Sequence, residues 1–174
     1  MKDIVQSIQG EYRRYKKLGE AAIQQLREEE LCVGGPGEAN SVAVVVWHIS
    51  GNLKSRFTDF LTSDGEKPWR HRDEEFEERT VSLAELRRKW DEGWGVAFEA
   101  LEPLTDDDLN RTIVIRGEQF RVHEALLRSV AHTAYHVGQI VHIAKTIRFG
   151  GHILVFMAGE WPEFPARQSV AVAQ

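Results

Sequence analysis

The sequence predicts an all-α protein, a four-helix bundle that forms a single domain over residues 1–174. Three observations favour this fold. Apolar residues recur every three or four positions along four long segments, and capping residues or glycines separate those segments. Hydrophobic residues make up 42% of the chain and charged residues 28%, which is typical of a globular protein. A chain of 174 residues suits one domain with a sizeable core better than two domains.

The first predicted helix covers residues 2 to about 30. Its apolar stripe has the spacing of an amphipathic helix and consists of Ile4, Ile8, Tyr12, Tyr15, Leu18, Ala22 and Leu26. The run GGPG at 34–37 ends this pattern, because glycine and proline interrupt helices. We therefore expect a turn there, before a second helix.

The second predicted helix begins near Asn40 or Ser41, which are both good N-caps, and runs to about Leu61. Its first turns, VAVVVW, are rich in β-branched residues and would also suit a strand. The apolar residues after them recur at helical intervals, and they are Ile49, Leu53, Phe57, Phe60 and Leu61. This spacing favours a helix throughout.

A polar connection over residues 62–81 has no clean periodicity and forms a long crossover between the second and third helices. Loops of this length are uncommon in compact domains and are often functional. Two interpretations are open. The loop is either solvated and anchored by Trp69, or it is a lid that brings Arg70 and Arg72 toward an anionic substrate or a thiol cofactor. We favour the solvated loop.

The third predicted helix starts at Ser82, which forms an S-x-x-E capping box with Glu85. One stripe of this helix holds Leu83, Leu86, Trp90, Trp94, Ala97 and Leu101. These residues are expected to face the core.

The fourth predicted helix runs from about Val122 to Arg148 and stops at Gly150. Before it, the segment RTIVIRGEQFRV alternates around Gly117, which predicts a small β-hairpin or an extended excursion. The residues beyond Gly151 are expected to be irregular.

Composition and charge exclude several classes of function. The net charge of −5, without a dense block of lysine and arginine, argues against a nucleic-acid partner. Cys32 is the only cysteine, so no internal disulfide is possible and a reducing compartment is the default. The sequence contains neither a signal-peptide pattern nor an apolar run of transmembrane length. We expect a soluble cytoplasmic protein with no membrane partner.

The segment from Ser129 to Ala144 contains no charged residue, yet it carries His132 and His136. Residues four apart share one face of a helix. A helix that is uncharged all round is expected to be buried on every side. Buried imidazoles need polar partners. The spacing fits either a divalent metal site or a pair of core histidines that have found hydrogen-bond partners.

A third metal ligand can be sought on the second helix. The fourth helix has a polar stripe of Arg128, His132, His136 and Gln139, and the second has one of His48, Asn52, Ser55 and Asp59. Facing helices of a bundle supply inward ligands, so His48 is expected to meet the histidine pair. Three histidines with further positions open are the layout of a catalytic metal site.

The remaining polar residues of these two stripes are candidates for supporting roles. Hydrogen bonds that orient the imidazoles are expected from Asn52, Ser55, Asp59 and Gln139. Arg56 and Arg128 are candidates for binding the carboxylate of a substrate, or they simply balance neighbouring acidic residues. No residue can be assigned as catalytic from the sequence.

The segments WHISGNL and AHTAYHVGQIVHIA resemble the DinB-like superfamily of metal-binding four-helix bundles, which includes YfiT-like proteins and thiol-dependent transferases. The first histidine of that family maps onto His48. Its H-x-x-x-H-x-G-Q pattern maps onto His132, His136, Gly138 and Gln139. The segment SRFTDFLTSDGEKPWRHRDEEF is similar to an uncharacterised bacterial branch, and the whole resemblance spans residues 5 to about 150.

This resemblance implies a divalent ion, with zinc or nickel as candidates, and a homodimer. It also implies a small-molecule thiol S-transferase that joins a low-molecular-weight thiol, such as bacillithiol, to an electrophile; one relative isomerises maleylpyruvate with mycothiol. The ion would make a thiolate available at neutral pH, or an activated water in a hydrolase. The alternative is a non-catalytic bundle that binds a metal or another ligand.

Overall fold

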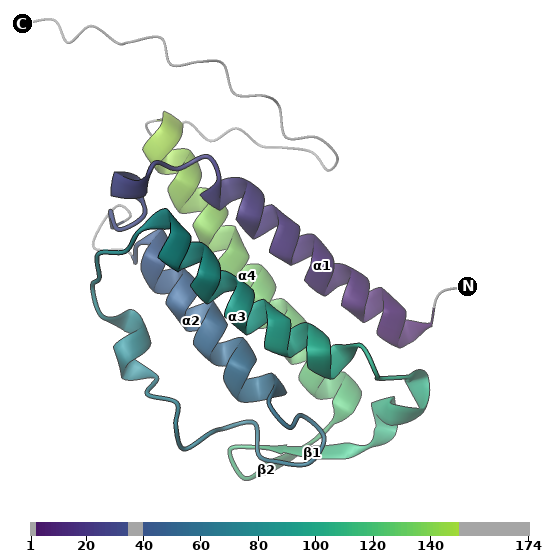
Figure 1. The fold of residues 1–174 in the computed structure, drawn as a ribbon. Helices are drawn as coiled ribbons and strands as arrows, with labels where there is room; N and C mark the ends of the chain where they lie inside the picture. The colour runs from purple at the N-terminus through teal and green to yellow at the C-terminus, as the bar shows by residue number, and fades with distance from the viewer. Residues whose placement is uncertain (1–2, 35–39, 150–174) are drawn as a thin grey trace, which may run out of the picture.

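The computed structural model describes residues 3–34 and 40–149. In this part, four α-helices form a bundle: α1 (Ile4–Ile23), α2 (Val42–Phe57), α3 (Leu83–Leu101) and α4 (Val122–Phe149) (Figure 1). The antiparallel strands β1 (Thr112–Ile115) and β2 (Glu118–Arg121) form a hairpin directly before α4. α2 packs against α3 and α4, and α1 packs against α4. The predicted fold class is therefore confirmed, whereas the predicted irregular segment after Gly151 lies outside the described residues.

The first helix is shorter than predicted, because α1 ends at Ile23 and a short 3₁₀-helix, η1 (Glu28–Glu30), follows it. The carboxylate of Glu30 accepts hydrogen bonds from the backbone N–H of Arg27 at 2.8 Å and from its guanidinium at 2.7 Å. These bonds close a tight turn. The turn lets Leu26 and Leu31 enter the core on either side of it.

The second helix starts as predicted and ends early. Ser41 is its N-cap, and the Ser41 hydroxyl accepts a hydrogen bond from the Val44 N–H at 3.3 Å. The helix ends at Phe57 because Thr58 is extended and Asp59 takes the left-handed conformation, with φ of 50°. The prediction that this helix continues to Leu61 is wrong, and Asp59 does not share a helical face with His48.

Large aromatic rings of three helices meet within the mainly aliphatic core. Tyr12 of α1 makes edge-to-face contacts with Phe57 of α2 and Trp94 of α3, at centroid distances of 5.8 and 6.3 Å. α3 lies close to α2 at Gly93, where an added Cβ would be 2.6 Å from the Cα of Ser50. This close approach fixes the backbone of α2 two residues away from His48.

The crossover between α2 and α3 is attached to the hairpin. Arg116 and Gly117 both have positive φ, 57° and 75°, as a two-residue type I′ turn requires. The carboxylate of Asp64 accepts hydrogen bonds from the N–H groups of both turn residues, each at 2.8 Å. Gly65 donates its N–H to the Val114 carbonyl at 2.8 Å. The crossover is therefore held beside the end of the bundle where the hairpin lies (Figure 1).

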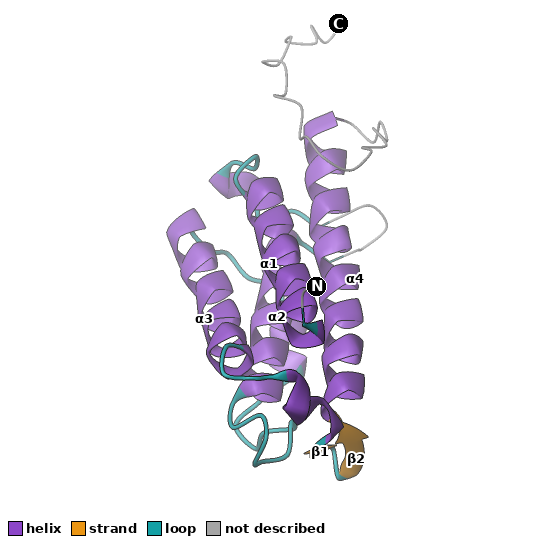
Figure 2. Cartoon of the chain, turned by 90° about the vertical axis from the view of Figure 1, so that its right-hand side faces the viewer, coloured by secondary structure: helices purple, strands orange, loops and turns teal. Residues whose placement is uncertain are grey.

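One face of α4 is exposed, so the prediction that its uncharged segment Ser129–Ala144 is buried on every side is wrong. Val137 and Ile140 face the core, whereas Leu127 is 58% and Tyr135 is 64% exposed. Figure 2 shows α4 at an outer edge of the bundle, packed on one side only. Among the described helices, none is long and apolar enough to span a bilayer.

Candidate metal centre

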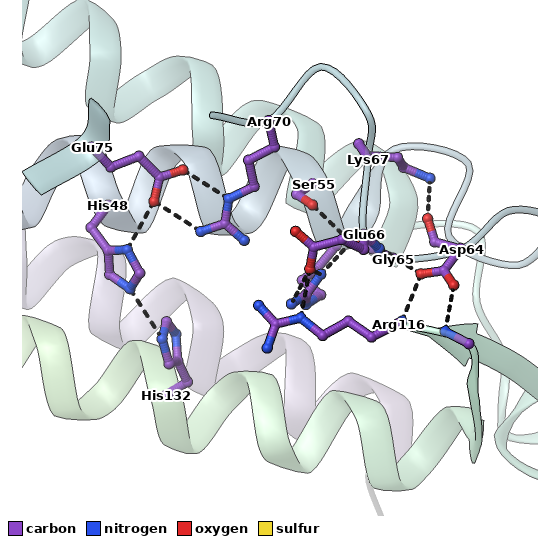
Figure 3. Close-up of polar contacts among 12 residues, drawn as sticks. His48, Ser55, Asp64, Gly65, Glu66, Lys67, Arg70, Glu75, Arg116 and His132 are labelled. Carbon is purple, nitrogen blue, oxygen red and sulfur yellow. Dashed lines mark hydrogen bonds and ion pairs between the residues drawn. The ribbon is translucent and has the colours of Figure 1, made fainter. Parts of the chain in front are cut away.

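Three histidines meet where α2 faces α4. His48 projects from α2, and His132 and His136 project from successive turns of α4. The Nε2 atom of His132 lies 3.2 Å from the Nε2 of His48 and 3.2 Å from the Nε2 of His136. All three potential ligand atoms lie within 4.8 Å of one another. The predicted triad is therefore together in space, and Figure 3 shows His48 and His132 turned toward each other.

The two separations around His132 suit ligands of a single ion. Imidazole nitrogens bind zinc at about 2.0–2.1 Å, and tetrahedral angles then place two such nitrogens about 3.3 Å apart. The two 3.2 Å separations around His132 match that spacing. Two of the three separations among the potential ligand atoms therefore match the spacing that a small divalent ion requires.

Hydrogen bonds at the opposite ring nitrogens fix the orientation of two of the imidazoles. The Nδ1 of His48 lies 2.9 Å from Glu75 Oε2, and the Nδ1 of His136 lies 2.7 Å from Gln139 Oε1. A carboxylate and an amide oxygen both accept hydrogen bonds, so each Nδ1 carries the proton and donates it. The Nε2 lone pairs of both rings therefore point into the cluster.

The three Nε2 atoms of the cluster cannot all be joined by hydrogen bonds to one another. The Nε2 of His132 carries at most one hydrogen, which can serve only one of its two neighbours. Burial, followed by the repulsion of a positive charge by His136, His48 and Arg70, lowers the pKa of His132 to about 3. Burial also lowers the pKa of His136, although its bond to Gln139 opposes the shift. Neutral rings with converging lone pairs are a suitable donor set for a cation.

A carboxylate and a guanidinium from the crossover support His48. Glu75 lies in the short 3₁₀-helix η2 (Asp73–Phe76) and is buried. Arg70 binds it in a two-pronged ion pair, with Nε 2.8 Å from Oε1 and Nη2 2.9 Å from Oε2 (Figure 3). Burial by itself raises the pKa of Glu75, but the hydrogen bonds from Arg70 and His48 outweigh it and the pKa is lowered. The ionised carboxylate holds the ring of His48 in place.

Glu75 and its role were not predicted from the sequence, although Gly51 is a signal for the position of Glu75. An added Cβ at Gly51 would lie 2.7 Å from the Cδ of Glu75. A glycine inside a helix costs stability, so its presence often marks a close approach by another group. Here Gly51 lies three residues after His48 and leaves the space that the carboxylate occupies.

A cavity of about 540 Å³ opens beside the cluster, and His48 and His132 form part of its wall. Residues from α2, α4, the hairpin and the crossover complete the lining. A volume of this size suits a small metabolite. Both histidines are therefore accessible from a space in which a substrate could lie.

A family model described as a protein of unknown function, DUF1572, matches residues 1–158. The chain belongs to the DUF1572 family. The matched range includes all four helices, the crossover and the three histidines. No curated protein and no solved structure matches the chain.

The other predicted site residues of this DUF1572 protein take different positions. Gln139 bonds to His136 as an orienting residue would. Asn52 is buried and lines the cavity, but it forms no hydrogen bond to a histidine of the described chain. Ser55 donates its hydroxyl to the Gly65 carbonyl at 2.7 Å, so it holds the crossover. Asp59 is exposed beyond the end of α2, and its predicted contact with the imidazoles is wrong.

The predicted arginines both line the cavity of this DUF1572 protein. Arg56 donates to the Gly65 carbonyl and pairs with Glu66, while Arg128 lies with its guanidinium carbon 5.5 Å from the Phe120 ring centroid. The two remaining histidines of α4 are outside the cluster. His123 bonds to a backbone carbonyl and His142 is exposed.

The crossover of the DUF1572 protein is neither solvated throughout nor anchored by Trp69. The Trp69 side chain is half exposed, whereas Arg70 and Glu75 are the residues that enter the site. The favoured interpretation from sequence is thus wrong about the anchor. A run of charged residues without periodicity gave no sign of which ones point inward.

Proposed function

We propose that this DUF1572 protein binds a divalent metal ion through His48, His132 and His136, and that it is a metal-dependent enzyme of the DinB-like superfamily. The observation that carries the proposal is the convergence of three Nε2 atoms while the Nδ1 atoms of His48 and His136 donate to Glu75 and Gln139. Zinc and nickel are the candidate ions, because borderline metals favour imidazole ligands.

The three-histidine arrangement favours a catalytic role over a structural one. No further histidine, cysteine or carboxylate of the described residues joins the group. Structural zinc sites usually have four protein ligands, whereas catalytic sites keep a position for water or substrate. The adjoining cavity of about 540 Å³ gives a small molecule access to that position.

The reaction class we propose is small-molecule thiol S-transfer to an electrophile. When bound, the ion would lower the pKa of a thiol, or of water in the hydrolase alternative, and so supply a nucleophile at neutral pH. The protein orients the ligands. Glu75 and Gln139 hold the Nδ1 protons of two rings, and Arg70 keeps Glu75 ionised.

Metal analysis of the purified protein tests the binding site. We expect one zinc or nickel ion per chain after reconstitution, and loss of that ion in His48→Ala and His136→Ala. His142→Ala is the matched control, because His142 is an exposed histidine on α4 outside the cluster. A wild-type protein that resists reconstitution with both metals would contradict the proposal.

A thiol screen tests the reaction. Metal-loaded protein is mixed with low-molecular-weight thiols and monochlorobimane, and the rate of the fluorescent thioether product is measured. The transferase predicts a thiol-dependent rate that His136→Ala abolishes and His142→Ala preserves. A metal-loaded protein that gives no rate above background with any thiol would contradict the transferase and favour the hydrolase or the non-catalytic bundle.

We further propose that two copies of the chain pair through the exposed face of α4. The residues Leu127, Ala131, Tyr135 and Gly138 of this face are exposed and uncharged. Size-exclusion chromatography coupled to light scattering tests this pairing. The wild type is expected to be a dimer and Leu127→Glu a monomer. Ile4→Glu is the matched control, because Ile4 on α1 is exposed to the same extent, 58%. A wild-type monomer would contradict the pairing.

A further inference from the structure

The cavity beside the histidines has an unusual excess of positive charge. Five arginines line it, namely Arg56, Arg70, Arg72, Arg116 and Arg128, against one acidic residue, Glu118. Glu66 pairs with Arg56 and Arg116, and Glu75 pairs with Arg70. Even with these two carboxylates counted, five guanidinium groups face three carboxylates. The wall of the cavity therefore favours a negatively charged ligand.

One of these arginines holds an unused donor in a buried position. The side chain of Arg70 is only 2% exposed, and its Nε and Nη2 bind Glu75. Its third nitrogen, Nη1, is buried and has no hydrogen-bond partner. Figure 3 shows this nitrogen on the side of the guanidinium that faces away from Glu75. A buried donor without a partner is costly, so a ligand that accepts its hydrogen bond would remove that cost.

Two further arginines of the wall lack a carboxylate partner. Arg72 and Arg128 lie against the rings of Phe76 and Phe120, at 5.2 and 5.5 Å from guanidinium carbon to centroid. Neither forms an ion pair with any described residue. The rings limit the positions of the guanidinium groups and leave their N–H groups available.

A neutral donor lies on the same wall. The amide of Asn52 is buried, lines the cavity and has no side-chain hydrogen bond among residues 3–34 and 40–149. It projects from α2 one turn after His48. The unused polar groups of the cavity are thus next to the histidine cluster, within reach of one small ligand.

We propose that this cavity binds a substrate through an anionic group, a carboxylate or a phosphate, held by Arg70, Arg72 and Arg128 while another part of the same molecule reaches the histidines. Carboxylates and phosphates share the oxygen spacing that guanidinium groups bind in pairs. The assignment of this ligand as a substrate rests on the proposed enzyme function. The anion site itself depends only on the arginines.

Calorimetry with simple anions tests the proposal on the full chain, both metal-free and zinc-loaded. The probes are inorganic phosphate, succinate and succinamide, the last being the neutral counterpart of succinate. We expect an anion to bind both forms of the protein, and succinamide to bind at least about tenfold more weakly than succinate, because charged hydrogen bonds are the stronger ones. The tighter of the two anions identifies the group that the cavity prefers.

Arginine variants locate the binding. Arg72→Gln and Arg128→Gln are each expected to lower anion affinity about tenfold, which is the loss of one charge-assisted hydrogen bond. Both residues are exposed at the rim, so the substitutions leave the core unchanged. Arg88→Gln, on the outer surface of α3, is the control and is expected to bind as the wild type does.

The outcomes separate this inference from the proposed function. A protein that binds zinc but neither anion would overturn the anion site and leave the metal site standing. Anion binding that needs zinc and ignores both arginine variants would also overturn it, because the anion would then be a metal ligand. Anion binding that Arg128→Gln weakens, in a protein that takes up no metal, would support the anion site and contradict the metal-dependent enzyme.

Discussion

The two buried regions of the bundle differ in what fills them. Around Tyr12, Phe57 and Trp94, aromatic rings of three helices interlock, and the indole N–H groups of Trp94 and its neighbour Trp90 are neutral donors without a partner. Around His48 and Arg70, ring lone pairs converge and a charged donor has no partner. The aromatic region gains stability by removing apolar surface from water. The polar region carries desolvation costs that, in our proposal, a bound ligand offsets. This contrast separates the part that folds the chain from the part that we propose binds a ligand.

The largest effect is expected in the aromatic region. Trp94→Ala should lower the free energy of unfolding by about 3–5 kcal/mol, because it removes a fully buried ring and leaves a cavity. Urea denaturation of the metal-free protein measures this. The loss of unfolding free energy should be the same in the metal-free protein and in the protein held at a fixed zinc saturation. A loss below about 1 kcal/mol would contradict the contrast between the two regions, since the aromatic region would then contribute little to folding.

The polar region should gain stability only with its ion. Zinc at one hundred times its dissociation constant should raise the free energy of unfolding by about 2.7 kcal/mol, because it binds the folded chain alone. A chelator should reverse the gain, and His136→Ala should show none. His142→Ala serves as the control and should gain as much as the wild type. Equal stabilisation of His136→Ala would place the zinc elsewhere.

The support of His48 by the crossover predicts a smaller effect, on metal affinity. Glu75→Gln and Gly51→Ala should each weaken zinc binding about 10- to 100-fold, the usual effect of losing a partner that orients a ligand. The first removes the charge that bonds His48, and the second displaces the carboxylate. Competition with a chromophoric chelator measures the affinity.

A matched glycine variant controls for the added methyl group. An added Cβ at Gly95 of α3 would meet no atom within 4 Å. Gly95→Ala should therefore leave zinc affinity unchanged and raise stability by up to about 1 kcal/mol. Unchanged affinity in both Gly51→Ala and Glu75→Gln would show that the crossover plays no part in the metal centre.

The smallest effect concerns a helix cap far from the histidines. Ser82 accepts a hydrogen bond from the Glu85 N–H at 3.1 Å at the start of α3. Ser82→Ala should cost about 1 kcal/mol of stability and leave zinc affinity unchanged. Thermal unfolding and the same chelator assay check both parts. A drop in zinc affinity in Ser82→Ala would show that the stability of α3 and zinc binding are coupled, against the proposed separation of the two regions.

The sequence predicts the helices and the meeting of the histidines because both depend on periodicity. The spacing of Leu86, Trp90 and Trp94 defines the core face of α3, and the four-residue interval of His132 and His136 defines one face of α4. The facing stripe on α2 then identifies His48. These inferences need only the geometry of a helix.

Features that depend on tertiary contacts escaped prediction. Asp59 was placed on the polar stripe of α2, but the left-handed conformation at that residue depends on the turn that follows. Glu75 and Arg70 belong to a segment without periodicity, so their positions follow from hydrogen bonds across the crossover. The exposure of Tyr135 also escaped, because an uncharged residue fits the core and an outer face equally well.

X-ray absorption at the zinc edge of the reconstituted protein tests the central claim most directly. Three histidine ligands predict a first shell of nitrogen and oxygen at about 2.0–2.1 Å, with the outer-shell scattering of three imidazole rings. His136→Ala should lose one ring from that pattern or lose the metal altogether. A zinc shell that contains sulfur at about 2.3 Å, or that lacks imidazole scattering, would contradict the account.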